Sequence, residues 1–104
     1  MSGFRYLIDE DTPHAIRDWL VLRQPEIEVR VVGGDLAPPL STKDPEILDW
    51  IEREGFILIT LNRSTMPVHL RAHLEAGKHV PGIFILRHNV TKLFFKKEKF
   101  DQKK

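Results

Sequence analysis

The sequence contains no cysteine among its 104 residues. This absence excludes disulfides, thiolate zinc sites, iron–sulfur clusters and a cysteine nucleophile. An excess of one charge is also missing, because 16 Lys and Arg residues balance 15 Asp and Glu residues and leave a net charge of +1. Such a chain is neither a general electrostatic attractant for nucleic acid nor an acidic disordered segment. Any function must therefore come from local groups of side chains.

Long hydrophobic runs are absent as well. No apolar stretch approaches the roughly 20 residues that span a bilayer, and the N-terminus lacks the basic and then apolar layout of a signal peptide. We therefore expect a soluble protein of the cytoplasm. The hydrophobic content of 41% is enough for one core in a chain of this length.

Strand-like and helix-like segments alternate along the chain. The apolar patterns predict strands over 4–8, 27–32, 56–60 and 82–86, and helices over 13–24, 45–54 and 67–77. The strands over 56–60 and 82–86 are continuously apolar, which is typical of parallel strands covered on both faces. This order predicts a three-layer α/β/α sandwich with a mainly parallel four-stranded sheet.

Several residues mark where the predicted helices begin, end and face inward. Thr12 and Asp44 each precede a proline, which predicts an N-cap followed by the first helical residue. Gly55 suits the position after the end of the second helix. In the third helix, Leu70 and Leu74 are predicted to point inward.

Polar residues follow the first and third predicted strands. Asp9, Glu10 and Asp11 come after the first strand, Thr60, Asn62 and Arg63 come at or after the end of the third, and Asp44 follows the long loop over 33–43. Ligands of open parallel sheets bind beyond the carboxyl ends of the strands. If the first and third strands are neighbours, as in a 2-1-3-4 order, these residues converge on one acidic pocket. Such carboxylates are relieved of mutual repulsion by Mg²⁺ or Mn²⁺.

The acidic residues also have structural alternatives. Asp11 and Asp44 lie at helix starts, where either can satisfy backbone amides instead of binding a metal. Asp9 is still attached to the strand, so a site role is favoured for it. Glu10 points away from Asp9 by strand alternation and is interpreted as a surface or supporting residue.

His69 and His73 are four residues apart on the third predicted helix, the spacing of two metal ligands on one helix face. No glutamate follows the first histidine, and no third ligand is evident in the sequence. We therefore expect a solvated helix face. Trp19 and Trp50 lie beside core positions, so their expected role is packing.

Four segments together resemble a known family: "LIDEDTP", "STKDPEILDWIEREG", "FILITLNRSTMP" and "HVPGIFILR". Their order and spacing resemble those of short PIN-like proteins, relatives of the PIN-domain ribonucleases that include toxins of toxin–antitoxin pairs. The resemblance spans about residues 4–87. It implies a PIN-like fold, a Mg²⁺ or Mn²⁺ cofactor and metal-dependent cleavage of RNA.

The resemblance also assigns roles to individual residues. It implies that Asp9 and Asp44 are metal-binding and catalytic carboxylates, while Asp11 stands where the family commonly has asparagine. Asn62 stands at the third metal position, where the family has aspartate, so the site loses one negative charge and should hold the cation less tightly. Asp11 and Thr60 are expected to support these ligands.

Two functions follow from this pattern. One is a metal-dependent endoribonuclease, for which Arg63 and Lys43 are candidates to bind substrate phosphate. The alternative is a non-catalytic PIN-like module with a degenerate site. Candidate partners are RNA, an antitoxin-like protein and a second copy of the chain.

We expect the PIN-like domain to cover residues 1–88, followed by a basic tail over 89–104. Six lysines and two acidic residues follow Val90. A solvated tail is the first interpretation, with binding of RNA or a partner as the alternative. The phenylalanines of this tail favour docking on the domain or on a second copy.

Overall fold

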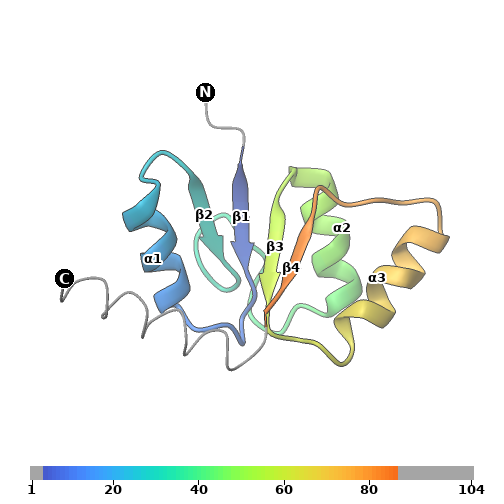
Figure 1. The fold of residues 1–104 in the computed structure, drawn as a ribbon. Coiled ribbons are helices and arrows are strands. Elements are labelled where there is room, and N and C mark those ends of the chain that lie inside the picture. Colours follow the sequence, from blue (N-terminus) through green and yellow to red (C-terminus); the bar gives the residue numbers. More distant parts are fainter. Residues whose placement is uncertain (1–3, 87–104) are drawn as a thin grey trace.

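The computed structural model describes residues 4–86, in which strands and helices alternate (Figure 1). The elements are β1 (Arg5–Ile8), α1 (Ala15–Arg23), β2 (Glu28–Val31), α2 (Asp44–Glu54), β3 (Ile57–Thr60), α3 (Met66–Glu75) and β4 (Ile83–Ile85). The strands form one parallel sheet in the order β2-β1-β3-β4. The predicted α/β architecture is therefore confirmed, and β1 and β3 are neighbours.

Two groups of buried side chains separate the three layers. Successive residues of a strand point to opposite faces of the sheet. Leu7 and Leu58 pack on one face with residues of α2 and α3, whereas Ile8 and Ile59 pack on the other with Ile16 of α1. Figure 1 shows α1 beside β2, and α2 and α3 across the sheet from it.

The first helix begins later than the sequence predicts. Thr12 was expected to cap a helix starting at Pro13, but α1 begins at Ala15 with His14 at the N-cap. The backbone makes a turn first, in which the Thr12 amide donates to the carbonyl oxygen of Asp9 at 3.1 Å. The Thr12 hydroxyl is buried and has no hydrogen-bond partner within residues 4–86. The predicted cap at Thr12 is therefore wrong.

The second helix begins one residue earlier than predicted. Lys43 occupies the N-cap with extended backbone, and Asp44 is the first helical residue, so the predicted cap at Asp44 is also wrong. The negative charge of Asp44 lies in the first helical turn, where the helix dipole favours it. At the other end Gly55 adopts φ +79°, a left-handed conformation that glycine adopts easily, and its amide donates to Ile51.

The third helix is rotated about its axis from the predicted orientation. Leu74 was expected to point inward, yet 48% of its surface is exposed. Met66 and His73 are buried instead, and Leu70 packs against the core between them. This rotation places His69 and His73 beside carboxylates of α2.

None of the helices in residues 4–86 combines the length and the apolar character that crossing a membrane requires. The proposed boundary at residue 88 and the basic tail over 89–104 lie outside the described residues.

The core is expected to be sensitive to truncation at β3. Leu58 is completely buried in the layer between the sheet and α2, so Leu58→Ala should lower the free energy of unfolding by about 2–5 kcal/mol. Val68 on α3 is 65% exposed, and Val68→Ala is the matched control, expected within about 0.5 kcal/mol of wild type. Urea denaturation followed by circular dichroism measures both, and equal effects of the two substitutions would contradict this packing.

Candidate active site

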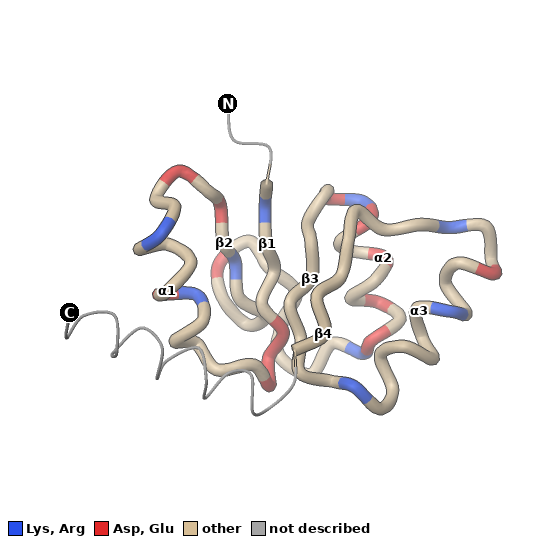
Figure 2. Tube along the Cα trace, in the orientation of Figure 1, with Lys and Arg blue, Asp and Glu red and all other residues tan. Residues whose placement is uncertain are grey.

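The candidate site lies at the carboxyl edge of the sheet between β1 and β3. These strands pair in parallel with Ile8 beside Ile59, so Asp9 and Thr60 follow at the same level. The Asp9 amide donates to the Ile59 carbonyl oxygen at 2.9 Å. Because the chain crosses from β1 to β2 on one side and returns to β3 on the other, this is the switch point of the sheet. Figure 2 shows acidic positions directly after β1 at this edge.

Two hydrogen bonds fix the carboxylate of Asp9. The buried hydroxyl of Thr60 donates to Asp9 Oδ2 at 2.7 Å, and the backbone amide of Glu10 donates to Oδ1 at 2.8 Å. Thr60 Oγ1 also accepts a hydrogen bond from the backbone amide of Asn62 at 3.0 Å. One threonine thus connects the end of β3 with the end of β1.

A second group of contacts connects the end of β3 with the start of α2. Asn62 Nδ2 donates to Asp44 Oδ2 at 2.9 Å, and the Thr65 hydroxyl is 3.3 Å from the same oxygen. Asn62 Oδ1 accepts the Thr65 amide at 3.0 Å at the start of α3. The side-chain amide of Asn62 therefore holds Asp44 with its nitrogen and the α3 turn with its oxygen.

The two aspartates are close enough to affect each other electrostatically. Burial is the main cause that raises the pKa of Asp9 above its ordinary value of 3.8, and the negative charges of Asp44 and Asp11 add to this rise. The hydrogen bonds from Thr60 and Glu10 act in the opposite direction. Deprotonated Asp9 therefore lies in surroundings that favour a nearby positive charge.

The donor set fits a hard divalent cation at two of the three predicted ligands. Each oxygen of Asp9 accepts one hydrogen bond and retains a lone pair, and Asp44 Oδ1 accepts no hydrogen bond from residues 4–86. Carboxylate oxygens of this kind suit Mg²⁺ and Mn²⁺. The oxygen of Asn62 is turned toward Thr65, so in this arrangement Asn62 orients Asp44 and leaves ligation to the two carboxylates.

The other predicted residues surround this group at the surface. Lys43 and Arg63 are exposed, and neither side chain has a hydrogen bond or ion pair within residues 4–86. Asp11 is exposed and acts on Asp9 through its charge. Glu10 accepts the Ser41 amide at 2.7 Å and so fastens the long loop before α2 to the end of β1.

The sequence interpretation missed two contacts of Asp44. Thr65 lies beside its Oδ2, and His69 Nε2 is 3.9 Å from the same atom. The expected solvated face for His69 and His73 is also wrong, since only 6% of His73 is exposed. The four-residue spacing of the histidines was a usable signal, but their partners on α2 depend on how the helices pack.

A second group of side chains lies farther along α2 and α3. Ligand atoms of Asp49, Glu52 and His73 lie within 4.8 Å of one another, so these three residues can hold a metal ion. None of the three was predicted as a site residue.

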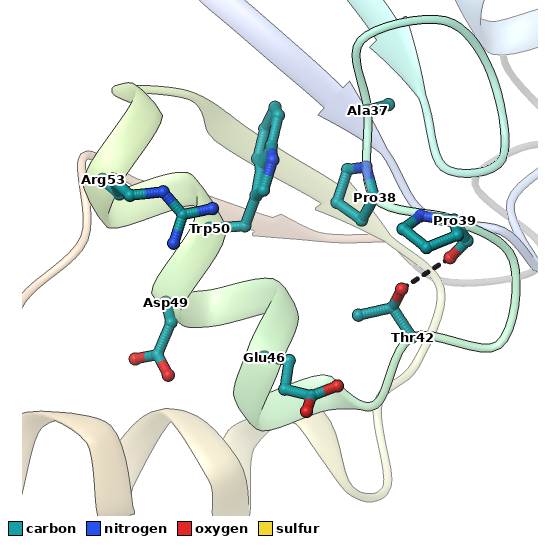
Figure 3. A pocket seen from close by; sticks show the side chains of 8 residues that line it. All are labelled: Ala37, Pro38, Pro39, Thr42, Glu46, Asp49, Trp50 and Arg53. Carbon is teal, nitrogen blue, oxygen red and sulfur yellow. Dashed lines mark hydrogen bonds between the residues drawn. The ribbon is translucent and has the colours of Figure 1, made fainter.

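A cavity of about 430 Å³ lies between α2 and the long loop (Figure 3). Trp50 points from α2 toward Pro38 on the loop, and the Thr42 hydroxyl donates to the Pro39 carbonyl oxygen. Trp50 also packs on Phe56, as expected for a core tryptophan. None of the predicted site residues lines this cavity.

We find no match to this chain among protein-family models, curated proteins or solved structures. The resemblance to PIN-like proteins therefore stays a prediction from the sequence motifs.

The raised pKa of Asp9 predicts a pH-dependent stability. At pH values between the unfolded pKa of 3.8 and the higher folded pKa, Asp9 is protonated more often in the folded state than in the unfolded state. The free energy of unfolding therefore falls as pH rises through this range. Asp9→Asn lacks this titration. Denaturation in chelator should show the stability of Asp9→Asn, relative to wild type, increasing from about pH 3 to about pH 7. A difference independent of pH would show that Asp9 titrates normally.

Proposed function

We propose that this protein is a PIN-like ribonuclease whose Mg²⁺ or Mn²⁺ binds between Asp9 and Asp44. The observation that carries the proposal is the hydrogen-bonded connection of these two carboxylates, from separate segments, through Thr60 and Asn62 at the switch point of a parallel sheet. Burial and mutual repulsion make a cation favourable there. The position agrees with the general rule for ligands of open α/β sheets.

Each residue of the site has a distinct task in this proposal. Thr60 fixes the orientation of Asp9, and Asn62 fixes that of Asp44. When bound, the cation polarises a phosphodiester and lowers the pKa of an attacking water. The exposed Lys43 and Arg63 provide positive charge for the phosphates of RNA.

The biological setting proposed for such an enzyme is that of a cytoplasmic toxin held by an antitoxin-like protein. The support for this setting is the resemblance of the sequence motifs to PIN-like proteins.

Removing the charge of Asp9 should abolish activity. Asp9→Asn keeps an oxygen for the Thr60 hydroxyl but removes half of the carboxylate pair, so RNA cleavage in Mn²⁺ should fall by about 100-fold or more. Asp18→Asn is the matched control, because Asp18 lies on α1 and pairs with Arg17. Gel analysis of a labelled single-stranded RNA measures the rates. Cleavage that persists in chelator and in Asp9→Asn would refute the ribonuclease.

A second candidate function is a non-catalytic module that binds RNA or a protein through this edge. The observation that favours it is the hydrogen bond from Asn62 to Asp44, at a position where the family has aspartate. A neutral amide there lowers the negative charge available to a cation. Binding would then depend on the exposed cationic side chains and need no metal.

Asn62→Asp distinguishes the two candidates. A carboxylate at this position faces Asp44 without a donor, so the variant should be less stable than wild type in chelator. Added Mn²⁺ should restore its stability and bind more tightly than to wild type, as measured by thermal unfolding and calorimetry.

The control is Asn62→Ala, which removes the hydrogen bond without adding charge. It should lose stability in chelator and gain no more stability from Mn²⁺ than the wild type gains. If Asn62→Asp acquires cleavage that wild type lacks, the wild-type chain is the non-catalytic module. If the wild type and Asn62→Asp both cleave RNA, the ribonuclease is supported.

A further inference from the structure

The inner surface between α2 and α3 contains a buried imidazole surrounded by oxygen atoms. The side chain of His73 is 4% exposed. Its Nε2 is 2.7 Å from Glu52 Oε1 and 3.2 Å from the His79 carbonyl oxygen, and its Nδ1 is 3.6 Å from Asp49 Oδ1. All three oxygens are hydrogen-bond acceptors. A ring that carries its proton on Nε2 donates to Glu52, and a metal cation can take the place of that proton.

A second imidazole reaches the same group from the loop before β4. His79 Nδ1 is 3.8 Å from Glu52 Oε2, and its side chain is 82% exposed. The loop backbone is held in place through the contact of the His79 carbonyl oxygen with His73. Glu52 thus lies beside both imidazoles, and Asp49 lies beside the second ring nitrogen of His73.

We propose that Asp49, Glu52, His73 and His79 form a Zn²⁺ site, separate from the Asp9 site. A set of nitrogen and carboxylate donors is typical of Zn²⁺, whereas Mg²⁺ prefers oxygen ligands with several waters. His73 and the two carboxylates offer atoms within 4.8 Å of one another, and His79 supplies the fourth donor by rotation of an exposed side chain.

The arrangement of α2 supports this assignment. Asp49 and Glu52 are three residues apart and lie on the same helix face. Figure 3 shows Asp49 pointing to the opposite side of α2 from Trp50, which faces the loop. Asp49 also lines the cavity beside Trp50, whereas Glu52 and His73 do not. A bound ion would connect α2, α3 and the loop that leads into β4.

Lys78 competes with a metal ion for the carboxylate of Asp49. Its Nζ donates to Asp49 Oδ1 at 2.9 Å, and this hydrogen bond is the main cause that lowers the pKa of Asp49. Binding of Zn²⁺ displaces the ammonium group from the carboxylate. The lysine therefore weakens the site without being one of its ligands.

The test is calorimetric titration of the tag-free full chain with Zn²⁺, together with ¹⁵N spectra of the histidine rings. One equivalent of Zn²⁺ should bind, raise the unfolding temperature and shift the ring signals of His73 and His79, leaving His69 unchanged. The Asp9 site holds oxygen ligands, so Asp9→Asn should leave this binding intact and keep the two proposals separable.

Single substitutions test which side chains bind Zn²⁺. Glu52→Gln and His73→Asn should weaken Zn²⁺ binding by more than about 100-fold, since loss of even an outer partner costs about 10- to 100-fold. His69→Asn, one turn earlier on α3, should bind as wild type. Lys78→Met should bind roughly two- to fivefold more tightly, the worth of a half-exposed ion pair.

Folding of each variant is checked by circular dichroism, and Glu52→Gln keeps the test open if His73→Asn fails to fold. Ring shifts at His69 instead of His73, or Zn²⁺ affinity unchanged in Glu52→Gln, would overturn the site. Absence of any Zn²⁺ binding would overturn it as well.

Discussion

The parallel pairing of β1 with β3 is the constraint on which the rest of the structure depends. It places the ends of two strands at one level, so that the buried hydroxyl of Thr60 can hold the carboxylate of Asp9. The turn after β3 then brings Asn62 to the start of α2, where Asp44 lies. Two short chains of hydrogen bonds thus fix two negatively charged carboxylates that repel each other. The free energy gained by burying the apolar strands of the sheet offsets the electrostatic repulsion between the two carboxylates.

Much of the fold could be predicted from the sequence because its signals are local. The continuous apolar run of β3 indicated a central strand, and the rule for carboxyl ends of parallel strands brought Asp9 and Asn62 to one crevice on the condition that β1 and β3 are neighbours. Asp44 was assigned to the same site through the resemblance to PIN-like proteins. Which way Asn62 turns could not be predicted, since its amide can donate or accept. The hydrogen bond with Thr65 decides this, and it arises from the turn before α3.

The interface of α2 with α3 was beyond sequence reasoning for a different reason. Apolar spacing favoured Leu74 as the inward residue, yet the packing of Met66 against the core sets the rotation of α3 and buries His73 instead. A buried imidazole is stable there because the Glu52 carboxylate of α2 accepts a hydrogen bond from it. Helical periodicity predicts a face, but the partner helix determines which polar residue that face can bury.

Paramagnetic broadening by Mn²⁺ in the amide NMR spectrum of the full chain tests the central claim most directly, namely that Asp9 and Asp44 hold one cation together. At substoichiometric Mn²⁺ the account predicts that the signals of Asp9, Glu10, Asp44 and Asn62 broaden first and disappear together. Broadening that spreads evenly over exposed acidic residues, or that affects Asp9 without Asp44, would contradict it.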